Sequence, residues 1–190
     1  QKANIDVVIN GNGNKFTGVM TVFGDARKSD YETFTIKNIN FVAKNGADSC
    51  IYSPESTEQN PARYSYSHNV TVENCTFTDP DGVVDCAAVR HGDGGDEDWI
   101  IKNCTVDNTM HSLIQTNNVE SKLTISGCTV NSKNGINLNS CTNVEITGCT
   151  FDTKGYNVRF GVNSGGNPDA AKKFLIKDST LKSANDDGDA

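Results

Sequence analysis

The stretch NVEITGCTF at residues 143–151 decides the fold, because variants of it recur along the chain. Its pattern is apolar, polar, apolar, polar, then a turn residue, a small residue, threonine and an apolar residue. The recurrences are FTIKNINF (34–41), NVTVENCTF (69–77), WIIKNCTV (99–106), LTISGCTV (123–130) and FLIKDSTL (174–181), and residues 7–16 fit more loosely. Repetition of this kind indicates that one structural unit is stacked several times.

The spacing and the period of this motif predict the architecture. Its small-residue position recurs at intervals of 21 to 36 residues. A helical repeat would need about 33 or more residues per unit and apolar residues at helical spacing. Alternating apolar and polar residues, rich in Val, Ile, Thr and Phe, indicate short strands instead. We therefore predict an all-β chain folded as a right-handed parallel β-helix, a solenoid of about six to seven coils.

Within one repeat the alternation predicts which side chains face the core. Val144 and Ile146 point inward from one strand, and Cys149 and Phe151 point inward from the next, with a corner at Gly148. The corner position of successive repeats holds Asn38, Asn74, Asn103, Gly127, Gly148 and Asp178. These residue types tolerate a left-handed backbone at low cost, so we expect positive φ at every corner.

The chain has seven cysteines, and four of them occupy the small-residue position that follows the corner. These four are Cys75, Cys104, Cys128 and Cys149. A disulfide framework would place cysteines at dissimilar positions that meet in space, whereas one cysteine per repeat predicts a stack of like residues. We expect reduced thiols in the core. No CxxC pair occurs, so we expect no zinc site.

Composition narrows the functional classes. The formal net charge is −7, with 24 acidic and 17 basic residues, which argues against nucleic acid as the partner. No apolar run is long enough to span a bilayer, so we predict no membrane span. The length of 190 residues suits one domain covering residues 1–190. Because no cap is visible at either end, we expect an uncapped fragment of a longer chain, stacked on neighbouring domains or subunits at its open ends.

The repeated motifs VTVENCTF, LTISGCTV and VEITGCTF resemble those of the pectin-lyase-like right-handed parallel β-helix superfamily, over nearly the whole chain. The resemblance implies the fold more strongly than any function. That superfamily includes polysaccharide lyases, polygalacturonase-like hydrolases, phage tailspikes and bacterial surface adhesins, which commonly bind glycans on one outward strand face. It therefore implies an extracellular location, on a bacterial cell surface or a virion.

The outward face in question is that of the third strand of each coil. We predict a glycan-binding surface formed by Arg90, His91, Gln115, Asn137, Asn139, Asn157 and Arg159. Amides and arginines suit bidentate hydrogen bonds to sugar hydroxyls or to a carboxylate. The alternative is plain solvation, because the solvent face of any strand is polar.

The loop at residues 91–98, HGDGGDED, follows one of these strands and concentrates carboxylates. We consider Asp93, Asp96, Glu97 and Asp98 as ligands for Ca²⁺, which prefers hard oxygen donors. The resemblance adds a reason, since pectate lyases use calcium to bridge enzyme and anionic substrate. The spacing is not that of an EF-hand, and an ordinary solvated loop is the alternative. We predict no other cofactor.

The leading hypothesis is a non-catalytic structural module of a bacterial surface or phage virion protein, with polysaccharide or cell-surface glycan binding on its outward face. The alternative is a polysaccharide lyase similar to pectate lyases, acting on an anionic polysaccharide. Such a lyase would need a base and a cation, for which His91 or His111 and Arg90 or Arg159 are candidates. No pair of outward carboxylates suited to hydrolysis appears on the third strands. We assign no catalytic residue.

Overall fold

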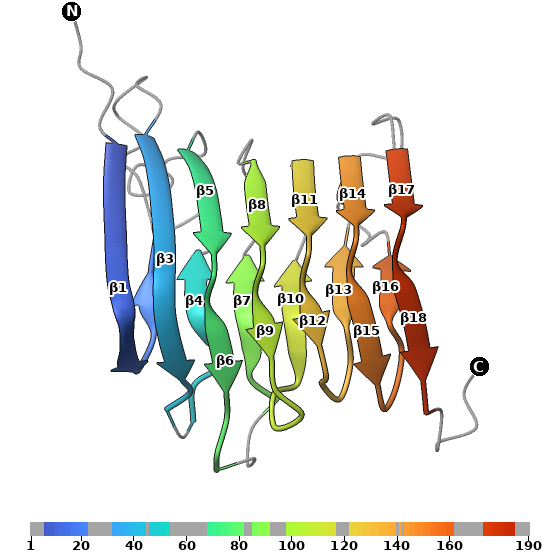
Figure 1. Cartoon of the computed structure of the whole chain (residues 1–190), viewed down its shortest axis with the longest axis horizontal. Helices are drawn as coiled ribbons and strands as arrows, with labels where there is room; N and C mark the ends of the chain where they lie inside the picture. Colours follow the sequence, from blue (N-terminus) through green and yellow to red (C-terminus); the bar gives the residue numbers. More distant parts are fainter. Residues whose placement is uncertain are drawn as a thin grey trace, which may run out of the picture.

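The computed structural model describes residues 6–22, 32–44, 46–53, 68–81, 85–91, 98–116, 122–139, 141, 143–161 and 173–184. The regular secondary structure of these residues is entirely β-strand, and the strands pair in parallel (Figure 1). The predicted all-β class with parallel strands is therefore confirmed. The described residues include no helix with the length and apolar character that crossing a membrane requires.

The described strands form two sheets. The 12-stranded sheet contains β1 (Asp6–Thr17), β3 (Glu32–Val42), β5 (His68–Glu73), β6 (Thr76–Thr78), β8 (Trp99–Lys102), β9 (Thr105–Val106), β11 (Lys122–Ser126), β12 (Thr129–Val130), β14 (Asn143–Thr147), β15 (Thr150–Thr153), β17 (Lys173–Lys177) and β18 (Thr180–Ser183). The 6-stranded sheet contains β2 (Met20–Thr21), β4 (Ser49–Ser53), β7 (Ala87–His91), β10 (Ser112–Thr116), β13 (Ile136–Asn139) and β16 (Val158–Gly161).

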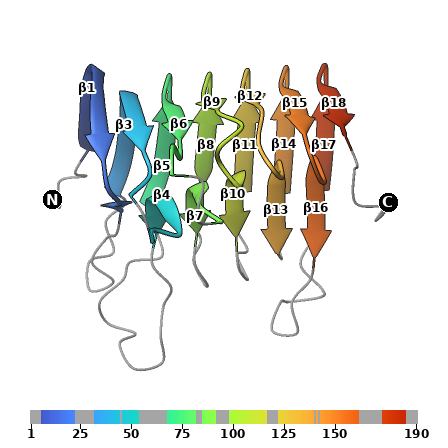
Figure 2. The ribbon, with the colours of Figure 1, turned by 90° about the horizontal axis from the view of Figure 1, so that it is seen from below.

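Equivalent strands of successive repeats lie side by side. One half of the large sheet has the order β3-β5-β8-β11-β14-β17 and the other half β3-β6-β9-β12-β15-β18, so the long strand β3 belongs to both. The large sheet is curled between these halves (Figure 1). The small sheet has the order β2-β4-β7-β10-β13-β16, and Figure 2 shows it from below. From β5 onward, three consecutive strands thus contribute one member to each half and one to the small sheet, up to β16.

The repeated motif is aligned between neighbouring repeats without offset. Leu123 pairs with Trp99 on one side and with Val144 on the other. A slip of one residue would turn every inward side chain outward, so burial of one face holds the register. Like residues therefore stack on like residues along the length of the molecule.

The corner residues have the predicted left-handed backbone. Positive φ is found at Asn38, Asn74, Asn103, Gly127, Gly148 and Asp178, with values of 51° to 63°. At Gly127 a Cβ atom would also lie 2.6 Å from Oδ1 of Asn103, so the corner of the preceding repeat folds over it. Gly127 follows Asn103 in the stack of corners, and the glycine leaves room for the asparagine amide.

The predicted inward side chains form the core. Val144, Ile146, Cys149 and Phe151 are all buried. Aromatic rings continue this packing between repeats, since Phe41 and Phe77 stack with centroids 5.1 Å apart. The core is thus a set of apolar files that run perpendicular to the strands, each file contributed by one position of the motif.

All seven cysteines are buried and free, as predicted. In the four that follow a corner, the thiol donates a hydrogen bond to the carbonyl two residues earlier, at 3.3 to 3.4 Å. Ser179 makes the same bond to Lys177 O at 2.9 Å. Hydrogen bonds with Cys128 and Cys75, together with burial, raise the pKa of Cys104 and keep it protonated. The position therefore selects a small side chain with a hydrogen-bond donor.

The corner can be tested by substitution at Gly148, where a Cβ atom would meet no other atom within 4 Å. We expect Gly148→Ala to lower the free energy of unfolding by about 1–2 kcal/mol, because alanine disfavours positive φ. Gly148→Asn, which copies the corner of other repeats, should cost clearly less. Urea denaturation of both variants measures this difference. Equal losses in the two variants would show that the left-handed backbone is not the cause.

Candidate functional site

The outer face of the 6-stranded sheet carries one continuous file of side chains. In-register pairing joins Tyr52 to Arg90, Arg90 to Gln115, Gln115 to Asn137, and Asn137 to Arg159. Strands are about 4.8 Å apart, so the file spans about 19 Å. Four of these residues are among those predicted for the outward face, and the pairing places them side by side.

Alternation explains why these residues face outward. Arg90 lies between the buried residues Val89 and His91, and Gln115 lies between Ile114 and Thr116, which are also buried. Tyr52 was missed by the sequence analysis, although it follows the buried Ile51 in the same way. The signal that could have found it is the short alternation SCIYS, which follows the motif at residues 34–41 as the other strands of the small sheet follow theirs.

An ion pair lies near the Tyr52 end of the file. Arg90 Nη1 lies 2.9 Å from Asp48 Oδ2, with 29% of the arginine side chain exposed. A hollow of about 300 Å³ lies at this end, lined by Val19, Asp48, Ser49, Tyr52 and Arg90. The ion pair holds the guanidinium in place while leaving part of it accessible to a ligand.

A polar cluster borders the middle of the file. Both ring nitrogens of His111 have an amide neighbour: Gln115 Nε2 lies 2.9 Å from Nδ1, and Asn134 Nδ2 lies 3.2 Å from Nε2. His111 Nε2 also lies 3.7 Å from Asp85 Oδ1, and Lys133 Nζ lies 3.3 Å from the same oxygen. The cluster therefore joins turns that precede three neighbouring strands of the small sheet.

Burial controls the charge of His111. It lowers the pKa of the imidazole, while the nearby Asp85 carboxylate acts in the opposite direction and Lys133 in the same direction. The ring is thus held neutral near pH 7. A neutral imidazole can accept a proton, so this is the group in the cluster with acid–base capacity.

The other end of the file carries an arginine over an aromatic ring. The Arg159 guanidinium carbon lies 6.0 Å from the centroid of the Tyr156 ring, at the limit of a cation–π contact. Burial raises the pKa of Tyr156, although Arg159 partly opposes the shift. Tyr156 precedes β16 as His111 precedes β10, so it extends the same border of the file.

The remaining predicted glycan-binding residues lie elsewhere. His91 is 3% exposed, and its ring centroid lies 5.3 Å from that of Trp99, so it belongs to the core and not to the outward file. It follows Arg90 directly, and alternation turns it inward. Asn157 precedes β16, and its Oδ1 accepts a hydrogen bond from Thr153 Oγ1 at 3.2 Å. Asn139 is half-buried and pairs with Gly161, beside the file rather than in it.

The predicted calcium ligands are mostly outside the described residues. Asp93, Asp96 and Glu97 lie there, whereas Asp98 is described and exposed. The Asp98 carbonyl accepts a hydrogen bond from Val70 N at 3.0 Å, so its backbone belongs to the strand edge. Within the described part of the chain, no group of three or more His, Cys, Asp or Glu residues could hold a metal ion.

Comparison of the chain with protein-family models, curated proteins and solved structures gives no match. The function is therefore inferred from the geometry of the file and its border. Asp48, Asp85, Lys133 and Tyr156 belong to that geometry and were not predicted. They lie in or next to turns, whose lengths differ between repeats, so no fixed spacing reveals them.

His111 offers a titration test of this cluster. We expect its midpoint in the folded protein below the 6.5 of an ordinary histidine, because burial disfavours the charged ring. The folded pKa is depressed, so the contribution of His111 to stability falls as the pH drops through 6.5 towards the folded value. NMR titration of the imidazole measures the midpoint. Asp85→Asn should lower it further and Lys133→Gln should raise it, and shifts of the opposite signs would contradict the described cluster.

Proposed function

We propose that this chain is a right-handed parallel β-helix module that binds an anionic glycan along the file of Tyr52, Arg90, Gln115, Asn137 and Arg159. The fold part of the proposal is supported by the strand order, in which every third strand returns beside its equivalent. The binding part is supported above all by one observation. Two arginines and two amides from four successive strands stand in register on one outer face.

The chemistry of the file favours a glycan with carboxylates. A guanidinium forms two parallel hydrogen bonds to a carboxylate, and side-chain amides donate to and accept from sugar hydroxyls. The net charge of the chain is −7, so two arginines on one face are a local departure from an acidic molecule. An extended ligand would contact several strands at once, and its affinity would be the sum of individually weak contacts.

The proposal also implies the kind of protein to which the module belongs and its location. A rigid stack of strands with a binding face suits a non-catalytic structural module of a surface or virion protein, in an extracellular location. Calcium held by the loop at residues 91–98 would assist an anionic ligand beside Arg90. The binding experiment below, performed with and without calcium, tests the binding face and the role of calcium.

Binding should weaken when the arginines are neutralised. We expect the double variant Arg90→Gln/Arg159→Gln to bind oligogalacturonate about tenfold more weakly, because each exposed charge contact contributes up to about 1 kcal/mol. Lys177→Gln, an exposed cation on β17 outside the file, is the matched control. Isothermal titration calorimetry, after a screen of acidic glycans, measures both. Absence of binding to every acidic glycan, or an equal loss in the control, would refute the proposal.

A second candidate function is polysaccharide lyase activity on an anionic polysaccharide. The observation that favours it is a neutral, half-buried His111 next to Lys133, bordering a file that ends in Arg159. A lyase needs a base for the sugar proton and a cation for the neighbouring carboxylate. Ultraviolet absorbance of unsaturated products from polyuronates distinguishes the two functions. Product formation that His111→Ala abolishes would replace the non-catalytic proposal.

We also propose an association surface at the end of the stack, formed by β16, β17 and β18. Phe160, Phe174, Ile176 and Leu181 occupy core positions there but are 40% to 46% exposed. The sheet orders place no described strand beyond β16, β17 or β18. We propose that a neighbouring domain or subunit covers this end, because apolar surface and unpaired strand edges favour association.

Association at this end can be measured directly. We expect the chain to self-associate as its concentration rises, and Ile176→Glu to shift the equilibrium towards the monomer by burying a charge in the contact. Glu145→Lys, on the outer face of the adjacent strand β14, should leave association unchanged. Sedimentation equilibrium gives the mass of each variant. A monomer at every concentration, before any substitution, would show that this end does not attract a second copy.

A further inference from the structure

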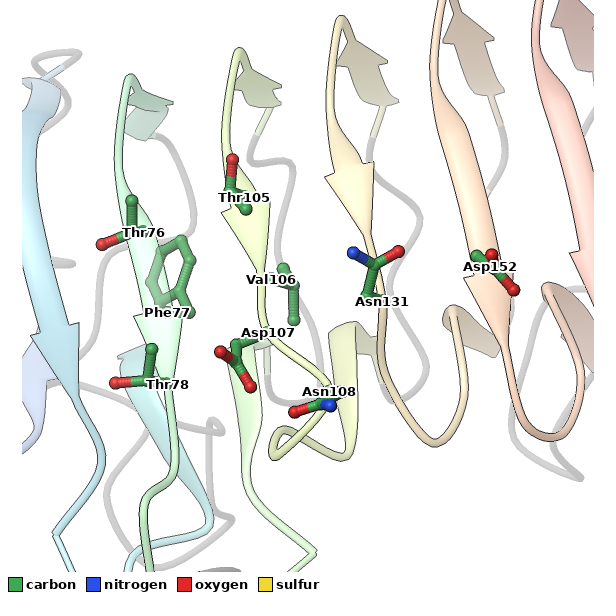
Figure 3. Close-up of a pocket in the computed structure, with 9 residues that line it drawn as sticks. All are labelled: Thr76, Phe77, Thr78, Thr105, Val106, Asp107, Asn108, Asn131 and Asp152. Atoms are coloured by element: carbon green, nitrogen blue, oxygen red, sulfur yellow. The ribbon is translucent and has the colours of Figure 1, made fainter.

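A second groove lies on the 12-stranded sheet, away from the small sheet that carries Arg90 and Arg159. It follows β6, β9, β12 and β15 on the outer side and has a volume of about 600 Å³ (Figure 3). That volume is within the range of about 300–1,000 Å³ typical of ligand sites. Its polar lining consists of Thr76, Thr78, Thr105, Asp107, Asn108, Asn131 and Asp152.

The floor of the groove is built from two in-register files. Thr76 pairs with Thr105, and the threonine file continues on β12 and β15. Asp107, Asn131 and Asp152 directly follow Val106, Val130 and Phe151, which are also paired in register. Side chains two residues apart in a strand face the same side. The threonine hydroxyls therefore form one row, and the carboxylate and amide groups of Asp107, Asn131 and Asp152 form a second row parallel to it.

The groove has acidic character. Among the described residues that line it, Asp107 and Asp152 are carboxylates and none is cationic. Asp107 Oδ1 accepts a hydrogen bond from Thr109 N at 2.8 Å, which holds that carboxylate in position. Lys182 is the register neighbour of Asp152, but the two form no ion pair among the described residues. Both carboxylates therefore keep their charge available to a ligand.

A single metal ion does not explain this arrangement. Asp107 and Asp152 lie on strands two spacings apart, about 9.6 Å, with Asn131 between them. Carboxylate oxygens bind calcium at about 2.3–2.6 Å, so the two groups cannot easily share one ion. The spacing suits an elongated ligand with separated positive charges instead.

We propose that this groove binds a glycan that carries amino groups, of the glucosamine oligosaccharide class. Ammonium groups would donate to Asp107 and Asp152 in charge-assisted hydrogen bonds, and sugar hydroxyls would pair with Thr105 and Asn131. This site is independent of the proposed anionic-glycan face, because its charge has the opposite sign and its residues are on the other sheet.

The lining favours a glycan over a basic peptide. The apolar stems of lysine and arginine side chains pack on exposed apolar surface. Phe77 and Val106, the apolar residues of the lining, have relative exposures of 0%. A ligand in this groove thus meets threonine hydroxyls and methyl groups, amides and carboxylates, and a sugar with hydroxyls at its edge and apolar C–H faces matches this mixture.

The test is isothermal titration calorimetry with a short glucosamine oligosaccharide at mildly acidic pH, where its amines are protonated. We expect Asp107→Asn/Asp152→Asn to weaken binding about tenfold, because two exposed charge contacts are lost while shape is kept. Glu145→Gln removes an exposed carboxylate outside the groove and should change little. The N-acetylated oligosaccharide, which lacks the charge, should bind about tenfold more weakly to the unaltered protein.

Several outcomes would overturn the proposal. These are no binding of the glucosamine oligosaccharide, an equal loss in Glu145→Gln, or equal affinity for the N-acetylated form. Circular dichroism checks that the double variant is folded, and Thr105→Val supplies a second, uncharged change in the groove that should also weaken binding. Arg90→Gln/Arg159→Gln should leave this binding intact, so the failure of one site is distinguishable from the failure of the other.

Discussion

The left-handed residue at each corner is the constraint on which the rest of the structure depends. Strand alternation alone would not bury both Ile146 and Cys149, which are three residues apart. The positive φ of Gly148 shifts the alternation by one residue, and the Cys149 thiol then reaches the carbonyl of Thr147. Because the corner recurs in each motif, strands before and after it stay in register through the whole stack.

Register converts a repeated motif into extended surfaces. Once strands pair without offset, every outward position becomes a file, and the chemistry of each file depends on what the repeats carry there. The small sheet presents Arg90 and Arg159 in one file, whereas the large sheet presents Asp107 and Asp152 in another. The two faces therefore differ in charge although the same geometry builds both, which separates the ligands that each can attract.

The turns supply side chains at irregular positions that the strands do not offer. Strand positions repeat and offer only regularly spaced side chains, while His111 and Lys133 come from turns next to the strands and reach a common carboxylate on Asp85. Turn length varies between repeats without disturbing the core, since the corners and buried files are unaffected. The irregular part of the chain is thus where a stacked fold can acquire individual chemistry.

The sequence by itself determined the all-β class, the parallel repeats, the left-handed corners and the buried cysteines, because each depends on a local pattern. It also placed Arg90, Gln115, Asn137 and Arg159 on one file through alternation. Only the tertiary structure decided that the His91 ring meets the Trp99 ring and that Asp85 meets His111. These contacts join different repeats across turns of unequal length, and no period in the sequence encodes such distances.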